Sequence, residues 1–181
     1  MTHRCMTCTD AGSMFDRRKF LKTVALGGGI TLYAGLPLAA RAAGAGIQAL
    51  LLSCMDYRLI DETERYMTER GLRNQYDHII LAGASLGATT SKFPAWNKTF
   101  WEHVDAAIKL HSIKKVMVMD HRECGAYNIV YGRDVSKNRD EETKIHTAEL
   151  KKLDGQIHMK YPKLDSELLI MNLDGKVEKI A

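Results

Sequence analysis

The chain has 181 residues, a length that suits one domain, and it carries 26 basic and 22 acidic side chains. Residues 1–42 contain six of the basic and two of the acidic residues, so residues 43–181 hold 20 of each and have no net charge. This balance argues against a nucleic-acid-binding domain, which would show an excess of Lys and Arg.

Residues 1–43 are predicted to be an export signal. Arg17 and Arg18 precede an apolar stretch at 23–38, and Ala40-Arg41-Ala42 then offers the small-x-small pattern of a cleavage site. This order resembles a twin-arginine signal, so the expected partner is the twin-arginine export machinery and the expected location is periplasmic or secreted, in a bacterium. The apolar stretch is too short and glycine-rich for a stable membrane anchor. A retained anchor and a chance arginine pair are the alternatives.

Residues 1–13 lie upstream of Met14 and are interpreted as an extension or as a misassigned start. They contain Cys5 and Cys8, but a single CxxC without a second ligand pair is weak evidence for a metal site. The predicted single domain, residues 44–181, keeps the two other cysteines, Cys54 and Cys124. In an oxidising compartment these two could instead form a disulfide.

Four continuous apolar runs in this domain indicate buried strands, at 46–53, 78–82, 115–119 and 168–171. Helices are expected between them, at 61–70 with Asp61 as the N-cap, at 94–111, and at 143–160 with a weak point at Gly155. Asp174-Gly175 indicates a short C-terminal hairpin. Apolar strands that alternate with helices are typical of a mainly parallel β-sheet covered by helices, so the predicted fold class is α/β.

Three of the predicted strands run directly into segments that could contribute to a functional site. The first runs into Cys54, the second into Ala82-Gly83, and the third into His121 and Cys124. The carboxyl ends of parallel strands form one edge of an open α/β sheet, where ligands bind. We therefore expect Cys54, His121 and Cys124 to converge there.

Two thiolates and one imidazole are typical of a catalytic zinc site, in which three protein ligands leave the fourth position for water or substrate. The candidate fourth ligand is Asp56, two residues after Cys54. Arg58 could hold the Asp56 carboxylate in a bidentate pair. Asp56 could then either bind the metal and close the site, or be held by Arg58 and accept a hydrogen bond from metal-bound hydroxide.

These segments resemble the β-class carbonic anhydrases. The resemblance is carried by CxDxR at 54–58, by the Ala-Gly turn at 82–83 and by HxxCGA at 121–126. It implies a zinc enzyme with Cys54, His121 and Cys124 as metal ligands and an Asp56–Arg58 catalytic pair. It also implies reversible hydration of CO₂ to bicarbonate by zinc-hydroxide attack, in homodimers or larger assemblies whose substrate pocket is lined partly by the neighbouring subunit.

The sequence departs from the family pattern in ways that bear on the substrate. Tyr57 stands where the family usually has Ser, and Ile80-Leu81 where it usually has Arg-Asn; the segment around 91–96 looks like an insertion. Two alternatives therefore stay open. One is a zinc hydrolase of carbonyl sulfide or carbon disulfide, which relatives of this fold act on. The other is a non-catalytic zinc or thiol-redox module.

Overall fold

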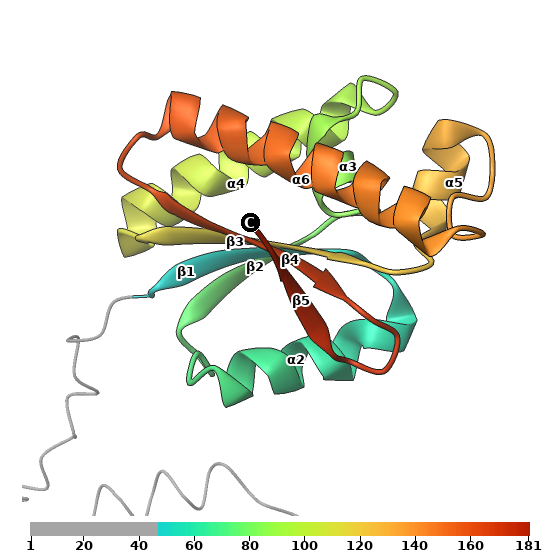
Figure 1. The fold of residues 1–181 in the computed structure, drawn as a ribbon. Helices are drawn as coiled ribbons and strands as arrows, with labels where there is room; N and C mark the ends of the chain where they lie inside the picture. Colours follow the sequence, from blue (N-terminus) through green and yellow to red (C-terminus); the bar gives the residue numbers. More distant parts are fainter. Residues whose placement is uncertain (1–46) are drawn as a thin grey trace, which may run out of the picture. The chain divides into compact units, whose positions relative to one another are not determined.

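The structure is a computed structural model that describes residues 47–181. The predicted export signal, its upstream extension and the Cys5–Cys8 pair lie outside these residues. A five-stranded sheet with the order β2-β1-β3-β4-β5 forms the centre of the described part (Figure 1). The strands are β1 (Ala49–Ser53), β2 (Tyr76–Ile80), β3 (Lys115–His121), β4 (Asp165–Met171) and β5 (Val177–Ile180).

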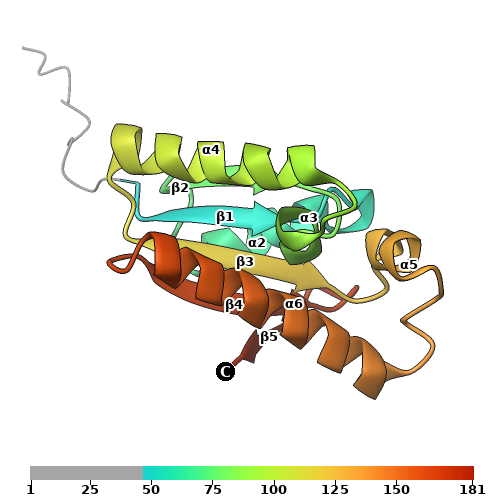
Figure 2. The same ribbon diagram turned by 90° about the horizontal axis from the view of Figure 1, so that it is seen from above.

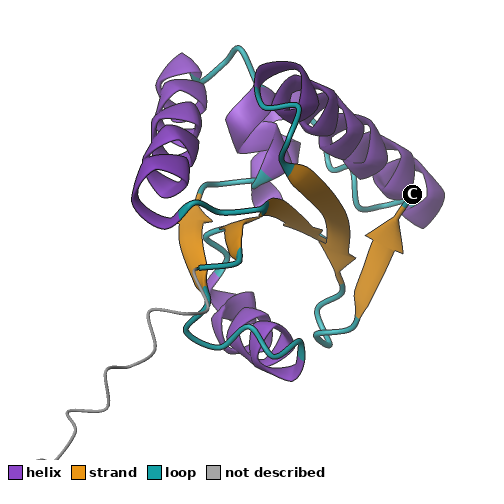
Figure 3. Cartoon of the chain, turned by 90° about the vertical axis from the view of Figure 1, so that its left-hand side faces the viewer, coloured by secondary structure: helices purple, strands orange, loops and turns teal. Residues whose placement is uncertain are grey.

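Four strands are parallel, and β5 pairs antiparallel with β4 as the predicted hairpin. Helices cover both faces of the sheet (Figures 1 and 3). On one face lie α3 (Ser85–Thr89), α4 (Pro94–His111), α5 (Gly125–Tyr131) and α6 (Arg139–Lys160); on the other lies α2 (Ile60–Glu69), preceded by the 3₁₀ turn η1 (Tyr57–Leu59). The predicted α/β class with a mainly parallel sheet is confirmed.

The apolar strands are explained by burial on both faces. Every residue of β1 is buried. Because successive side chains of a strand point to opposite faces, Leu50 and Leu52 pack in the core beneath α4 and α6, whereas Leu51 packs with Met67 of α2. Two hydrophobic cores thus hold the sheet between its helices, and the strand ends lie at one edge.

Several predicted boundaries needed correction. Asp61 is not the N-cap of α2: Leu59 holds that position without a side-chain cap, and Asp61 lies in the first turn, where its charge suits the helix dipole. The physical reason is that η1 leads directly into α2, so the capping carboxylate is that of Asp56, which accepts from the Arg58 N–H.

Two short helices, α3 and α5, follow strand ends and were not predicted; they are too short for a periodic signal. β2 ends at Ile80 rather than at Ala82, and α6 begins at Arg139 rather than at 143, because the Asn138 side chain accepts from the Glu141 N–H. α6 continues through Gly155 without a break. Seen from above, α3 and α5 lie at the carboxyl ends of β1 and β3 (Figure 2). Within residues 47–181, none of the helices combines the length and the apolarity needed to cross a membrane.

Candidate metal centre

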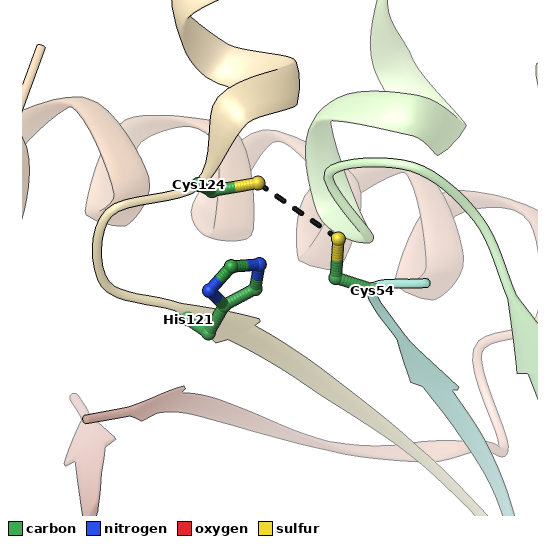
Figure 4. A group of neighbouring side chains, drawn as sticks. All are labelled: Cys54, His121 and Cys124. Carbon is green, nitrogen blue, oxygen red and sulfur yellow. Dashed lines mark hydrogen bonds between the residues drawn. The ribbon is translucent and has the colours of Figure 1, made fainter. Parts of the chain in front are cut away.

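Three side chains meet at the carboxyl edge of the sheet. Cys54 directly follows β1, His121 is the last residue of β3, and Cys124 is the N-cap residue of α5 (Figure 4). β1 and β3 pair so that Ser53 lies opposite Met119, which brings the two strand ends together. The ligand atoms of the three residues all lie within 4.8 Å of one another, and the two Sγ atoms are 3.8 Å apart. The convergence expected from the sequence is therefore present.

His121 is oriented to offer a nitrogen lone pair to this group. Its Nδ1 lies 2.8 Å from the backbone carbonyl of Arg122, which can only accept, so Nδ1 carries the proton. Its Nε2 is buried and has no hydrogen-bond partner among the described residues. An orphaned buried nitrogen is costly in a folded protein. A metal ion bound between Nε2 and the two sulfurs would satisfy it, so the residues fit a metal.

The surroundings of the two thiols favour ionisation of one of them, next to His121 Nε2. The Cys54 sulfur accepts from the Gly83 N–H at 3.2 Å and lies against Cys124. The hydrogen bond from Cys124, together with His121 and Gly83, outweighs burial and lowers the pKa of Cys54 to about 4. Hydrogen bonding to Cys54 and burial raise the pKa of Cys124 instead. Cys54 is thus the more readily ionised thiol of the pair, and a bound cation would favour ionisation of both thiols.

His121 responds to this charge as well. Burial by itself lowers the pKa of the imidazole, but the nearby Cys54 thiolate raises it by its negative charge, so that the net shift is upward. The three groups therefore form an electrostatic site that favours positive charge. Deprotonated thiolates and a neutral imidazole are the forms in which these residues bind metals.

Asp56 and Arg58 lie beside the three candidate ligands as a bidentate ion pair. Arg58 donates from Nε to Asp56 Oδ1 at 3.0 Å and from Nη2 to Oδ2 at 2.8 Å, and its backbone N–H also donates to Oδ1. Hydrogen bonding from Arg58 lowers the pKa of Asp56 to about 2. Asp56 Oδ2 lies 3.8 Å from His121 Nε2. An ionised carboxylate is thus next to the candidate ligands, with both of its oxygens engaged by Arg58.

A largely apolar cleft of about 430 Å³ opens next to Cys54, between β2, η1 and α2. Met55, Ile60 and Ile80 line it, together with His78, which is hydrogen-bonded to Ser53. A small uncharged molecule could approach the metal centre through this cleft. Ile80, one of the residues that depart from the family pattern, therefore lies on the wall of the cleft.

The structure adds a hydrogen-bond network around Asp120, a residue to which the sequence assigned no role. The carboxylate of Asp120 is buried and accepts hydrogen bonds from Ser85, Tyr127 and His146, at distances of 2.5 to 2.9 Å. This network attaches α3, α5 and α6 to the end of β3, next to His121. The available signal was an acidic residue at the end of an apolar strand, where burial demands hydrogen-bond partners.

Comparison with known sequences shows relatives over most of the chain. An uncharacterized protein of Rickettsia conorii is 42% identical over 131 residues, which cover 72% of this chain and 70% of the relative. An uncharacterized protein of Rickettsia bellii is 40% identical over 131 residues, covering 72% of this chain and 80% of that protein. These relatives indicate that the domain occurs elsewhere in a similar form.

Solved structures show the same fold at low sequence identity. A carbonic anhydrase from Streptococcus mutans is 16% identical and superimposes with a TM-score of 0.52, covering 91% of this chain and 96% of the other. A β-carbonic anhydrase from Trichomonas vaginalis is 16% identical with a TM-score of 0.50, covering 90% and 92%. Residues 45–180 match the family model described as "Putative carbonic anhydrase". The chain therefore belongs to this carbonic anhydrase family, of the β-carbonic-anhydrase-like fold.

Proposed function

We propose that the chain binds one zinc ion through Cys54 Sγ, His121 Nε2 and Cys124 Sγ and catalyses the reversible hydration of CO₂ to bicarbonate. The observation that carries this proposal is the buried, unpartnered Nε2 of His121 facing two sulfurs that lie 3.8 Å apart. Two thiolates and an imidazole suit zinc better than Mg²⁺ or Ca²⁺, which prefer oxygen. Membership of the carbonic anhydrase family agrees with this choice.

Three protein donors leave a fourth position at the metal, which is the arrangement of a catalytic rather than a structural zinc site. Zinc in such a site supplies acidity to a bound water, lowering its pKa from about 15.7 toward about 7 in a site with three imidazoles. Two thiolates are more electron-rich than imidazoles, so a less acidic water is expected here.

The protein's own contribution would come from the Asp56–Arg58 pair and the apolar cleft. Arg58 holds Asp56 ionised and in a fixed orientation. Asp56 can then accept a hydrogen bond from the attacking water and orient its lone pair toward the substrate carbon. The apolar walls formed by Met55, Ile60 and Ile80 suit a small neutral electrophile such as CO₂.

The same apolar walls favour a second candidate, hydrolysis of carbonyl sulfide or carbon disulfide. Both molecules are linear and neutral like CO₂, and Ile80 places an apolar side chain on the wall of the cleft. The third candidate, a thiol-redox module, is favoured only by the separation of the two sulfurs, which is short enough for oxidation to a disulfide after a small movement.

The test is stopped-flow CO₂ hydration by the zinc-loaded full-length chain, with carbonyl sulfide and carbon disulfide hydrolysis measured on the same sample. Asp56→Asn is the matched variant, because it keeps the shape but removes the charge. We expect CO₂ hydration that falls at least 10-fold in the variant, as expected for a residue that orients a reacting group. Zinc-loaded protein that hydrolyses the sulfur substrates but leaves CO₂ at the uncatalysed rate would contradict the proposal.

We also propose that the active form is a homodimer or a larger assembly. β2 is an edge strand, paired only with β1. Four large apolar side chains near this edge and the cleft are more than half exposed to solvent: Met55, Tyr57, Ile60 and Ile80. A second copy that covered them would bury this apolar surface. Light scattering after size exclusion should give at least twice the chain mass, and Ile60→Asp should shift the protein toward monomer.

A further inference from the structure

The loop between two of the proposed ligands, His121 and Cys124, contains a residue with unusual backbone geometry. Glu123 has φ of 57°, in the left-handed region that residues other than glycine rarely adopt. Both of its peptide groups are engaged: its N–H donates to Glu142 Oε1 at 2.7 Å, and its carbonyl accepts from Arg58 Nη2 at 3.2 Å. The strained backbone is thus held from two sides.

Glu142 reaches this loop from the first turn of α6. Its residue is only 3% exposed, so its carboxylate requires partners within the protein. One oxygen accepts from the Glu123 N–H, and the other lies 3.5 Å from Nη1 of the buried Arg122. Arg122 is itself fixed by Thr143 Oγ1 at 2.7 Å and by Glu178 Oε2 at 2.9 Å.

The backbone of Arg122 connects the same loop to the metal centre. Its N–H donates to the carbonyl of Met171 at the end of β4, and its carbonyl accepts from His121 Nδ1. The loop is therefore attached to the sheet at Arg122 and to α6 at Glu123. Glu142 touches neither the proposed ligands nor Asp56, so any effect on the chemistry must pass through the loop.

We propose that Glu142 is a positioning residue for the CO₂ hydration proposed above, on which this inference rests. By binding the Glu123 N–H, it fixes the backbone of Glu123 so that the Glu123 carbonyl faces Arg58, and that contact in turn keeps Arg58 in its bidentate pair with Asp56. The contacts form one continuous path, from Glu142 through the Glu123 backbone and Arg58 to Asp56.

The physical basis is the hydrogen-bonding demand of a strained peptide in a partly buried loop. A Gln side chain offers one acceptor oxygen where the carboxylate offers two, so it cannot accept from both the Glu123 N–H and Arg122. The charge-assisted hydrogen bond to the Glu123 N–H is lost, and the left-handed backbone is held less firmly. The backbone can then rotate about φ and ψ of Glu123, which takes the Glu123 carbonyl away from Arg58. Arg58 would then be anchored only to Asp56 and to the exposed side chain of Glu123. Loss of orienting partners around a metal site typically lowers affinity or activity about 10- to 100-fold.

The experiment measures kcat, KM and zinc content for Glu142→Gln, with Glu141→Gln as the matched control. Glu141 precedes Glu142 on α6, but its side chain is exposed and pairs with Arg133. We expect kcat of Glu142→Gln to fall about 10- to 100-fold with KM little changed and zinc retained. Glu141→Gln should stay within about twofold of the parent, as expected for an exposed side chain. A Glu142→Gln enzyme with full kcat, or one that has lost its zinc, would overturn the proposed route.

A double-mutant cycle separates this route from a general loss of structure. If Glu142 acts through Arg58, adding Glu142→Gln to Arg58→Ala should lower kcat by less than about twofold more, because interacting residues are not additive. If the double variant lost kcat by the product of the two separate factors, Glu142 would act independently of the Asp56–Arg58 pair, contrary to the proposal.

A second readout does not depend on activity. Cobalt(II) in place of zinc reports ligand geometry in its visible spectrum, and Glu142→Gln should shift this spectrum in the same direction as Arg58→Ala. An unchanged spectrum would contradict the proposal even if the parent protein proved inactive on CO₂. Inactivity of the cobalt- or zinc-loaded parent, by contrast, would count against the proposed function alone.

Glu142→Gln could fail to fold, because it leaves Arg122 buried with a weakened partner. Arg122→Met/Glu142→Met removes both charges at similar volume, and such replacements of a buried ion pair are often tolerated. This double variant lacks the acceptor for the Glu123 N–H, so it should show the same loss of kcat and the same cobalt shift. A folded double variant with parental kcat and spectrum would refute the proposal, and failure of both variants to fold would assign the pair to stability alone.

Discussion

Asp56 is the residue on which the proposed chemistry depends most directly, and its behaviour is set by one neighbour. Arg58 donates three hydrogen bonds to it and lowers its pKa to about 2. The carboxylate is therefore ionised at any pH at which the protein is expected to work. It lies close enough to His121 Nε2, at 3.8 Å, that a small movement could bring it onto a metal held there.

Replacement of Arg58 tests this restraint. In Arg58→Ala the three metal donors are intact, so we expect about one zinc per chain, as a three-ligand site requires. Asp56 loses its guanidinium partner and can move onto the metal, where it would occupy the fourth position. CO₂ hydration should then fall at least 100-fold, in the range seen when orienting and charge-stabilising groups are removed. Stopped-flow assays beside elemental analysis measure both quantities, and an active Arg58→Ala enzyme would argue against the pair.

Residues that bind through side chains could be predicted from the sequence, whereas residues that act through the backbone could not. HxxC after an apolar run, together with a second Cys after another run, was sufficient to predict that Cys54, His121 and Cys124 converge. The donation from the Gly83 N–H to Cys54 depends on a loop geometry that no residue type announces. Glu142 was missed for the same reason, because its partner is the peptide group of Glu123.

At the scale of elements, the centre depends on α3 lying close against the turn that precedes it. This helix was not predicted, since five residues give no measurable period. Gly87 permits the close approach: a Cβ at this position would lie 2.6 Å from the carbonyl oxygen of Ala82 and 3.2 Å from the Cβ of Leu81. The same turn continues into Gly83, which donates to Cys54. Packing of α3 and the geometry of the metal centre are therefore coupled.

We expect Gly87→Ala to destabilise the protein by about 1–3 kcal/mol, the usual cost of overpacking a tight site. Gly155→Ala is the control within α6, because a Cβ there meets no atom within 4 Å. It should stabilise the protein by up to about 1 kcal/mol through helix propensity. Chemical denaturation of both variants gives the free energies of unfolding. Equal stability of the two variants would show that the approach of α3 is less tight than the structure indicates.

Across the whole molecule, an ion pair links elements that are far apart in the sequence. Arg70, the residue after α2, donates to both carboxylate oxygens of Glu167 on β4 at 3.0 and 3.1 Å, and Lys115 lies 3.5 Å from one of them. Burial alone would raise the pKa of Glu167, but hydrogen bonding and charge from Arg70 place it below its ordinary value of 4.5. This pair ties α2 to the sheet at the end opposite the metal centre.

The pair predicts a specific acid sensitivity. The pKa of Glu167 is lower in the folded protein than its ordinary value of 4.5. The contribution of this ionised carboxylate to the free energy of unfolding is therefore fully present above pH 4.5 and is lost as the pH falls below that value. Glu167→Gln should cost about 1–2 kcal/mol at pH 6, the lower part of the range for charged hydrogen bonds, because Arg70 is partly exposed to solvent. The melting temperatures of the parent and the variant should converge as the pH is lowered from 6 to 3. A constant difference across this range would rule out the assigned role.

The whole chain also includes the predicted export signal, which lies outside the described residues. We propose that Arg17 and Arg18 direct twin-arginine export, as the order of arginines, apolar stretch and cleavage site suggests. Replacing both with Lys should retain the protein in the cytoplasm of a bacterium that has this pathway, without changing its zinc content. Cell fractionation measures this outcome. Unimpaired export of the Lys variant would contradict the proposed route.

The central claim is that Cys54, His121 and Cys124 hold zinc, and the zinc content of the full-length chain tests it most directly. Elemental analysis should follow purification under reducing conditions without added metal, with Cys124→Ala beside the parent. We predict about one zinc per parent chain and a loss of tight binding in the variant, because two donors rarely suffice. A metal-free parent with Cys54 and Cys124 joined in a disulfide, or full zinc in Cys124→Ala, would contradict the claim.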